Sequence, residues 1–348
     1  MHRIYENILN GICEINQISS YESLKKYLKD LQPYALSLWQ SYRRENVKVN
    51  YSDLNIQAAY LIRYYPLYAA MTLQVFKDLS QRTLLLSNNT LQVCLFGAGP
   101  APEAVGLINY LKNEFPHLIF AEFKAYDLAA DAWGYSRYIT KNYLLKEYFA
   151  GYFTLNGFST DMRQINAFKS IKYDIQSSMI FVIQNCLNEI DKEPNIFLEN
   201  IGFLVNEMPE GSILAIADQS NYNSTNILLN RVESYVRDIG QGDIIRSYTE
   251  GGISFHSLKM LPEIPPVIRE CLLTGQNGLI PRSSVKFNYL AFQKRTFISY
   301  QPYTEQLFMF PRTTITEFRA LPYPPPLREY DSYFTIPEPD SDPDDIPF

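Results

Sequence analysis

Residues 91–103 contain an apolar run, then two glycines, and then residues that are typical of the first turn of a helix. Val93–Phe96 has the length of a buried strand, and Gly97 and Gly99 follow it at once. Glycines in such a turn let the backbone come close to a bound molecule. Pro102 suits the first position of a helix. A strand, a Gly-x-Gly turn and a helix together predict a cradle for a nucleotide-derived cofactor.

The same turn argues against a cofactor that contains a pyrophosphate. The third glycine of the dinucleotide fingerprint is missing, because Pro102 occupies its position. Glu103 follows in the first helical turn, where its carboxylate would repel a phosphate. We therefore expect a cofactor without phosphates. The same two residues disfavour a nicotinamide-dependent dehydrogenase.

The run Phe96-Gly-Ala-Gly-Pro-Ala-Pro-Glu103 resembles the first motif of class I S-adenosylmethionine-dependent methyltransferases. The resemblance extends more weakly from about Leu91 to about Phe292. It implies an α/β fold with a Rossmann-like, seven-stranded mixed sheet, whose last strand inserts antiparallel. In that family the glycine turn lies under the methionine part of the cofactor. The residues that this would place against S-adenosylmethionine are Phe96, Gly97, Ala98, Gly99 and Glu103.

A further contact is expected at the end of the second strand. Leu118–Tyr126 has the pattern of that strand, and Asp127 and Leu128 follow it. The family holds the ribose hydroxyls with an acid at this place, because one carboxylate can accept from two hydroxyl donors. Asp127 lies 28 residues beyond Gly99, which is slightly more than the usual spacing of about 20. Glu122 is the alternative, although it falls in the middle of the strand.

The resemblance also implies contacts to the adenine ring. A third strand is expected at residues 152–157, followed by a loop. In the family an acid in this loop often meets the adenine amino group, and an apolar neighbour covers the ring. Asp161 and Met162 match these roles. A turn or a helix cap is an equally good interpretation of Asp161.

The transfer chemistry is expected beyond the fourth strand, Ser178–Cys186, because open parallel sheets bind ligands at the carboxyl ends of their strands. Asn185, Asn188 and Glu189 are the candidate catalytic residues there, and Asn185 would also contact the cofactor. Starting or capping the next helix is the alternative role of Asn188 and Glu189. The segment Leu187–Ile190 is similar to the corresponding stretch of the ribosomal small-subunit methyltransferase-like proteins. The metal-binding cysteines of that group are not evident here.

Methyl transfer from a sulfonium is an in-line displacement, so the protein supplies mainly alignment and a dry site. A general base is needed only if the acceptor must lose a proton. The sequence has no Asn/Asp-Pro-Pro-aromatic signature of exocyclic amino methylation, and Cys186 reads as a small buried hydrophobe. RNA is the favoured acceptor, from the ribosomal likeness and the basic N-terminal helices. A small molecule, a protein side chain and a non-catalytic ribosome-assembly role stay open.

Three regions are expected along the chain. Residues 1–88 read as a helical appendage with a capping box at Ser19–Glu22, an interruption at Pro33 and a cap at Ser52 or Asp53. Residues 89–300 carry the cofactor domain, with an irregular, proline-containing insertion at about 261–281. Residues 301–348 form a tail rich in proline, tyrosine and acids, whose end is expected to be disordered. A strap over the cleft and a site for a protein partner are both open for this tail.

Composition excludes several classes. The net charge of −6 comes from the tail, where nine acids meet three bases, so residues 1–300 are neutral and neither favour nor oppose nucleic acid. Four dispersed cysteines and three histidines predict no metal site and no disulfides, and hence a reducing, cytoplasmic setting. No apolar run of 18 residues and no signal peptide is present, so we expect no membrane contact.

Overall fold

A computed structural model gives the structure of the 348-residue chain. It describes residues 3–42, 49–80, 89–190, 192–220, 223–246, 248–249, 252–253, 256–259, 263–272 and 281–295. The chain divides into two units, Met1–Phe297 and Ile298–Phe348. The acidic tail, with its expected strap or partner site, lies outside the described residues, so these expectations stay predictions.

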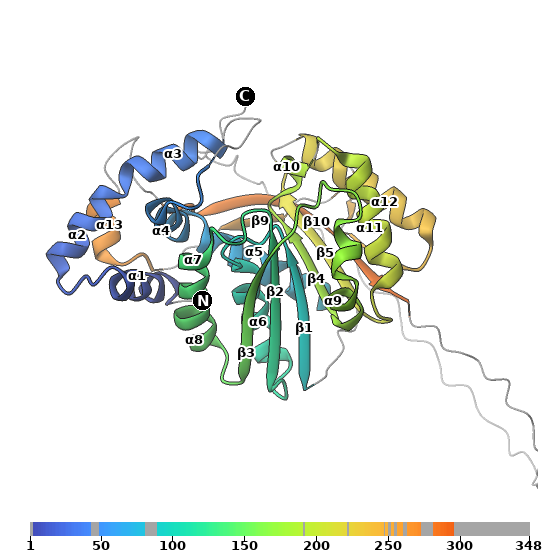
Figure 1. Cartoon of the computed structure of the whole chain (residues 1–348), viewed down its shortest axis with the longest axis horizontal. Coiled ribbons are helices and arrows are strands. Elements are labelled where there is room, and N and C mark those ends of the chain that lie inside the picture. Colours follow the sequence, from blue (N-terminus) through green and yellow to red (C-terminus); the bar gives the residue numbers. More distant parts are fainter. Residues whose placement is uncertain are drawn as a thin grey trace, which may run out of the picture. The chain divides into compact units, whose positions relative to one another are not determined.

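The first unit is built on one mixed sheet with the strand order β3-β2-β1-β4-β5-β10-β6 (Figure 1). The first five strands in sequence run parallel. The last strand, β10, lies antiparallel between β5 and β6, and it also pairs with β9. The predicted sheet with an antiparallel last strand is thus confirmed. Its strands are β1 (Thr90–Phe96), β2 (Phe120–Asp127), β3 (Tyr152–Ser159), β4 (Ile180–Gln184), β5 (Ile213–Gln219), β6 (Gly242–Ile245), β9 (His256–Lys259) and β10 (Ser284–Lys294).

Several strand and loop boundaries differ from those expected. Strand β3 continues to Ser159, so Phe158 belongs to the strand and not to the following loop. The expected irregular insertion at 261–281 contains a helix, α13 (Pro266–Leu272), within its described part. A small hairpin of β7 (Tyr248–Thr249) and β8 (Gly252–Ile253) lies between β6 and β9. The prolines of the insertion indicate irregular structure, but Pro266 stands at the first position of the helix, where proline is tolerated.

The N-terminal region is helical, as expected. Ser20, and not Ser19, caps the second helix, and its partner in the capping box is Ser23 and not Glu22. As expected, the helical pattern is interrupted near Pro33: one helix ends at Asp30 and the next begins at Gln32. Pro33 lies in the first turn of the new helix, where no N–H bond is lost. Asp53 caps the fourth helix as expected. The helices are α1 (Ile4–Ile15), α2 (Tyr21–Asp30), α3 (Gln32–Tyr42), α4 (Leu54–Arg63) and α5 (Tyr65–Ser80).

These helices share a hydrophobic core with the sheet. Buried side chains of α1 and α5, such as Ile8 and Phe76, belong to the same cluster as Val93 of β1. Helix α5 packs directly on α6 (Pro102–Glu114), and a Cβ at Gly106 would lie 2.3 Å from the carbonyl oxygen of Ala69. Only glycine permits this close approach. The N-terminal helices are therefore fixed firmly above the sheet that carries the site.

Other helices cover the opposite face of the sheet (Figure 1). Their buried side chains form a second cluster with Phe96, Phe181 and Leu290. They are α9 (Lys172–Ser177), α10 (Leu187–Ile190), α11 (Pro194–Glu207) and α12 (Asn223–Ile239). Between β2 and β3 lie α7 (Gly134–Ile139), a π-helical segment (Thr140–Leu145) and α8 (Lys146–Tyr148). Among the helices that the structure describes, none is both long and apolar enough to cross a lipid bilayer.

Candidate functional site

The glycine turn after β1 is the centre of the site. Gly97 and Gly99 have φ angles of +65° and +48°, which few other residues adopt. The Gly97 N–H donates to the carbonyl oxygen of Tyr126 at 2.8 Å, so the turn is attached to the end of β2. A Cβ at Gly97 would lie 2.8 Å from Sγ of Cys186 and 3.4 Å from Cε of Met162. The ends of β1 and β4 and the loop after β3 therefore meet here.

The turn is held under strain and is braced from two sides. Ala101 has a φ of +62°, a conformation that costs an L-residue other than glycine about 1–2 kcal/mol. The hydroxyl of Thr140 donates to the carbonyl of Pro100 at 2.7 Å, and Tyr65 donates to the carbonyl of Ala101 at 3.4 Å. Thr140 is the first residue of the π-helical segment, a rare element that is frequent at functional sites. This bracing keeps a strained turn in one conformation.

Asp127 lies where the sequence places it, next to the glycine turn. Its Oδ2 atom accepts from the Gly99 N–H at 2.9 Å, and its Oδ1 atom accepts from the Ala129 N–H at 2.8 Å. A carboxylate has about four acceptor sites. The two N–H groups use two of them and the Trp133 side chain uses a third, so an acceptor site remains for a hydroxyl donor. Burial raises the pKa of Asp127, while these two N–H groups lower it. The alternative residue, Glu122, lies 3.6 Å from Lys124 and takes no part in this arrangement.

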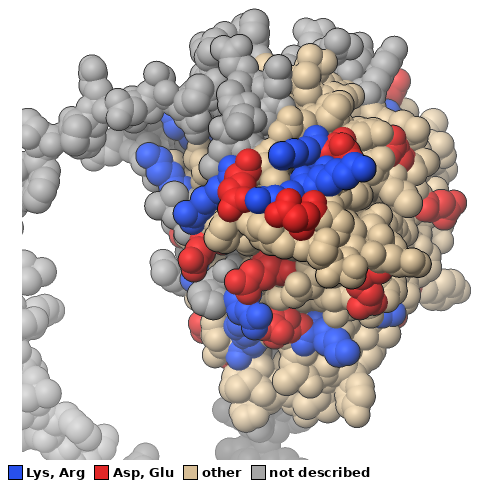
Figure 2. Space-filling view, turned by 90° about the vertical axis from the view of Figure 1, so that its left-hand side faces the viewer, with Lys and Arg blue, Asp and Glu red and all other residues tan. Residues whose placement is uncertain are grey.

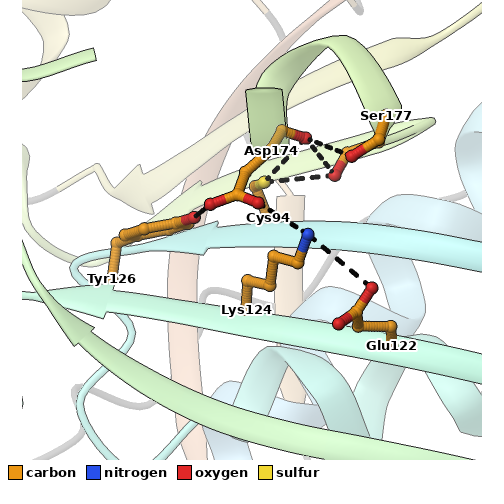
Figure 3. A network of polar contacts seen from close by, with 7 residues as sticks. Cys94, Glu122, Lys124, Tyr126, Asp174 and Ser177 are labelled. Carbon is orange, nitrogen blue, oxygen red and sulfur yellow. Dashed lines mark hydrogen bonds and ion pairs between the residues drawn. The ribbon is translucent and has the colours of Figure 1, made fainter. Parts of the chain in front are cut away.

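A polar network on the α9 side of the sheet fixes the residue before Asp127 (Figure 3). The Tyr126 hydroxyl donates to Oδ2 of Asp174, and Nζ of Lys124 donates to Oδ1 at 2.7 Å. The Tyr126 ring lies between those of Phe96 and Phe158, at 5.4 Å from each. Because the Tyr126 carbonyl also holds the glycine turn, this network determines the position of the turn relative to β2.

Glu103 is a buried acid that lacks a partner. Its side chain is on the first turn of α6, and the residue is only 3% exposed. Its Oε2 atom is buried without a hydrogen bond to any described group. Burial and the nearby charge of Asp127 raise the pKa of Glu103 to about 8. A buried carboxyl with an unused oxygen is costly unless a ligand supplies the missing partner.

The end of β4 offers a second unsatisfied side chain. Asn185 has a φ of +55°, and its backbone N–H donates to the carbonyl of Ala217 at 3.0 Å. Both Nδ2 and Oδ1 of Asn185 are buried and have no partner among the described residues. An amide can donate and accept at once, so Asn185 is suited to a ligand that carries both kinds of group. Asn188, which starts the next turn, is half-buried.

Two acids with raised pKa values lie near the carboxyl ends of β4 and β5. Desolvation and the charges of Asp127 and Asp218 raise the pKa of Glu189 to about 7. The residue is nevertheless exposed to solvent. Asp218 is buried, its pKa is raised to about 7, and it accepts from the Leu187 N–H at 2.8 Å. Asp218 thus holds α10 in place, and Glu189 keeps a free carboxyl.

The remaining predicted residues differ in their surroundings. Met162 is buried beside Gly97, as a residue covering the ring would be. The Asp161 carboxylate is occupied by a bidentate pair with Arg163, at 2.8 and 3.0 Å, which lowers the pKa of Asp161. Leu128 is 58% exposed. Phe96 and Ala98 are buried, and the Phe96 ring faces Tyr126, so only the backbone of these residues can face a ligand.

An aromatic wall beside the turn was not predicted. A Cβ at Gly99 would lie 3.1 Å from Cε2 of Trp133, so this indole covers the turn. Tyr51 stacks on Trp133 with ring centroids 4.4 Å apart, and Tyr60 lies 5.3 Å away. The charges of Asp127 and Glu189 act on Tyr51. The run Asp131-Ala-Trp133 was the available signal, but nothing in the sequence indicates that residues about 80 positions earlier pack on it.

Arg137 is a second residue that the sequence analysis missed. Its Nη1 atom is buried and lacks a partner among the described groups. The guanidinium lies over Gly157 near the end of β3, and a Cβ there would be 1.2 Å from Nη1. Burial lowers the pKa of Arg137, and the charges of Asp127 and Asp131 oppose this. Arg137 in turn lowers the pKa of Asp127, so it favours the ionised form of that acid.

We expect Gly157→Ala to weaken binding of a ligand at Asp127. A methyl group would displace the Arg137 guanidinium, and Asp127 would lose the cation that keeps it ionised. The expected loss is about 1 kcal/mol, or roughly fivefold in affinity at pH 7. Because the pKa of Asp127 rises, the loss should grow as the pH falls, which calorimetry at several pH values measures. Arg137→Met should show the same trend, and a pH-independent loss in both variants would contradict this role.

The arrangement of the sheet decides the fold. The order β3-β2-β1-β4-β5-β10-β6, with β10 antiparallel between β5 and β6, is the arrangement that the first motif implied. The glycine turn follows β1, and the acid follows β2 beside it. The chain has the fold of class I methyltransferases. No protein-family model matches the chain, and no curated protein is similar to it in sequence.

Solved structures of methyltransferases are similar to this fold at low sequence identity. One is the CMeT domain of the citrinin polyketide synthase, with 12% identity over 85% of this chain and 79% of that one, at a TM-score of 0.42. Precorrin-6y C5,15-methyltransferase from Geobacter metallireducens has 12% identity, coverages of 65% and 88%, and a TM-score of 0.37. The N-methyltransferase NodS from Bradyrhizobium japonicum, in complex with S-adenosyl-L-homocysteine, has 10% identity over 67% of this chain and 88% of that one, at a TM-score of 0.36.

Proposed function

We propose that the protein binds S-adenosylmethionine at the glycine turn and transfers its methyl group. The observation that carries this proposal is the Asp127 carboxylate. It is hydrogen-bonded to Gly99, Ala129 and Trp133, and it keeps an acceptor site for a ribose hydroxyl. Glu103 and Asn185 add buried polar atoms that lack partners in the described structure. A molecule that joins an amino acid to a nucleoside carries the hydrogen-bonding groups that these side chains lack.

The charges near the turn favour a cationic cofactor. The charge of Asp127 acts on both Glu103 and Glu189, and burial raises the pKa of all three acids. S-adenosylmethionine carries an ammonium and a sulfonium, and both would stabilise these carboxylates in the ionised form. A dinucleotide would instead bring two phosphates to the same acids. The site therefore supports the sulfonium cofactor over a nicotinamide one.

Cofactor binding should release a proton from Glu103. Its pKa of about 8 keeps it largely protonated at pH 7, and a neighbouring ammonium would lower that pKa. Affinity should therefore rise with pH up to about 8 and then level off. Calorimetry of S-adenosylhomocysteine in buffers of different ionisation enthalpy measures the release. Glu103→Gln should reduce it while the protein still folds, and equal release in both proteins would rule out this role.

Glu189 is the candidate general base of the transfer step. When bound, the cofactor supplies an electrophilic methyl group, and the protein aligns the acceptor with it and excludes water. Glu189 has a raised pKa of about 7, and none of the described residues forms a salt bridge with it, so it can accept a proton from an acceptor near neutral pH. We expect Glu189→Gln to lower kcat by about 100-fold with little change in cofactor affinity. A similar loss in cofactor affinity would place Glu189 in the binding site instead.

RNA is the acceptor that the sequence analysis favours, and it stays a prediction. On the face formed by the N-terminal helices, cationic and anionic side chains lie next to one another (Figure 2). Lys25, for example, pairs with Glu270 at 2.8 Å and approaches Glu22 at 3.8 Å. A face of mixed sign gives no particular advantage to a polyanion. The experiment therefore tests small-molecule acceptors alongside RNA.

The decisive experiment has two stages. Calorimetry with S-adenosylmethionine, S-adenosylhomocysteine and NAD measures which cofactor binds, and the proposal requires the first two only. Cellular RNA and a metabolite extract are then incubated with the protein and methyl-labelled cofactor, and label in each fraction is measured by mass spectrometry. Binding without label in any fraction would favour the alternative of a non-catalytic assembly factor. Absence of binding would overturn the proposal.

A further inference from the structure

Arg246 is a buried arginine whose hydrogen-bonding groups are only partly used. It directly follows β6, and its side chain is 0% exposed. Its Nη1 atom donates to Oδ1 of Asn230 at 2.9 Å and to Oε2 of Glu233 at 2.6 Å. Its Nε and Nη2 atoms are buried and have no hydrogen-bond partner among the residues that the structure describes. Buried donors of a charged group are costly when unpaired, so this arrangement requires an explanation.

The unused atoms form one edge of the guanidinium. Nε–H and the adjoining Nη2–H lie in one plane and point the same way, which is the fork that binds two oxygens of a carboxylate or phosphate. A single carbonyl oxygen or a water molecule satisfies only part of this fork. The geometry of Arg246 therefore selects a planar pair of oxygen acceptors.

The local charge balance also favours an anion. The Glu233 carboxylate is shared by two arginines, because its Oε1 atom accepts from Arg237 at 2.7 and 3.1 Å. Arg237 has a side chain that is 55% exposed, so water solvates its charge. The Arg246 side chain has no access to water, and it shares the Glu233 carboxylate, its one described acidic partner, with Arg237. A buried positive charge is thus left incompletely neutralised.

Two further buried donors lie on the same face of the sheet. Within the described part of the chain, Nδ2 of Asn288 and Oγ1 of Thr225 are buried and have no hydrogen-bond partners. Asn288 is on β10 two residues before Leu290, which packs with Leu228 of α12, so both β10 side chains face α12. Ile245 pairs with Ala291, which brings Arg246 level with Leu290. Thr225 lies three residues before Leu228, on the stripe of α12 that faces the sheet.

We propose that Arg246, Asn288 and Thr225 form a binding site for an oxyanion, a phosphate or a carboxylate group, under helix α12. Two oxygens of the anion accept from Nε–H and Nη2–H of Arg246. The amide of Asn288 and the hydroxyl of Thr225 are the donors for its remaining lone pairs. In the sheet, β4, β5 and β10 separate Arg246, at the end of β6, from β1, whereas Asn288 pairs with Asp218 of β5. The oxyanion site does not depend on the proposed methyl transfer.

The test uses the full chain and two probes, inorganic phosphate and acetate, at constant ionic strength. Phosphorus NMR and calorimetry measure binding at concentrations up to the order of 10 mM. We expect saturable binding of at least one probe to the wild type and a rise in Tm. The probe that binds distinguishes a phosphate site from a carboxylate site. Binding of neither probe would overturn the proposal.

Matched variants show whether the fork is responsible. Arg246→Lys keeps the charge but removes the fork, and it should weaken binding by about tenfold. Arg237→Met removes the exposed arginine that shares the same carboxylate, and its affinity should be unchanged. Equal binding by Arg246→Lys and the wild type would contradict the assignment. If Arg246→Lys does not fold, Asn288→Ala and crystals of the wild type grown with phosphate replace it; only water at the fork would then overturn the site.

Discussion

Replacing Gly99 by arginine should abolish binding of S-adenosylmethionine and leave the fold intact. Gly99 has a φ of +48°, and any Cβ there lies 3.1 Å from the Trp133 indole. An arginine side chain would extend over the turn, and its guanidinium would pair with Asp127 or Glu189 in place of the cofactor. The expected loss is more than about 100-fold, or roughly 3 kcal/mol. Calorimetry with S-adenosylhomocysteine measures it.

Gly134→Arg is the matched control for this variant. Gly134 directly follows Trp133, and a Cβ there meets no atom within 4 Å. The same side chain should therefore be accepted there with unchanged affinity. Circular dichroism and thermal unfolding show whether both variants fold, and the positive φ alone should cost Gly99→Arg about 1–2 kcal/mol of stability. Wild-type affinity in a folded Gly99→Arg protein would remove the cofactor from this turn.

Asp127→Ala is expected to have the second-largest effect on cofactor affinity. It removes the acceptor for the ribose hydroxyls and also leaves the Gly99 and Ala129 N–H groups without their partner. The loss of one charge-assisted hydrogen bond is worth about 1.5–3 kcal/mol, so affinity should fall roughly 10- to 100-fold. Calorimetry with S-adenosylhomocysteine measures the change.

A cofactor analogue without ribose hydroxyls separates the two causes of this loss. The wild type should bind the analogue more weakly than S-adenosylhomocysteine, whereas Asp127→Ala should bind both alike. Asp131→Ala serves as the control, because Asp131 is an exposed acid on the same segment. If Asp127→Ala still prefers the natural ribose, the hydroxyls bind elsewhere. A loss of the same size in Asp131→Ala would point to general electrostatics instead of a direct contact.

The sequence predicts the centre of the site well because the signals there are local. Strand β1, the turn at Gly97 and Gly99, and the helix from Pro102 to Glu114 follow one another without interruption. Each depends on the residue types at those positions, since only glycine readily adopts the turn and proline suits the first helical position. Asp127 could be predicted because parallel strands end at the same edge of a sheet.

The parts that the sequence misses depend on contacts between distant residues. Tyr51 stacks on Trp133, and Arg137 lies over Gly157, and neither pair shares a local pattern. The Asp161 role illustrates a different limit. An acid two residues before an arginine can form a bidentate pair with it, and that pair uses the same oxygens that a ligand would need. Sequence spacing cannot rank these competing partners.

The shared core also has a consequence for synthesis on the ribosome. Helices α1 and α5 bury their apolar faces against β1 and α6, which are translated after them. Until about residue 114 has emerged, the nascent chain therefore exposes side chains such as Ile8 and Phe76 to solvent or to chaperones. A fragment of residues 89–297 would have the converse problem, because the surface of α6 that packs against α5 would be exposed to water. We therefore expect the two regions to need each other for folding, so neither should be expressed as a separate fragment.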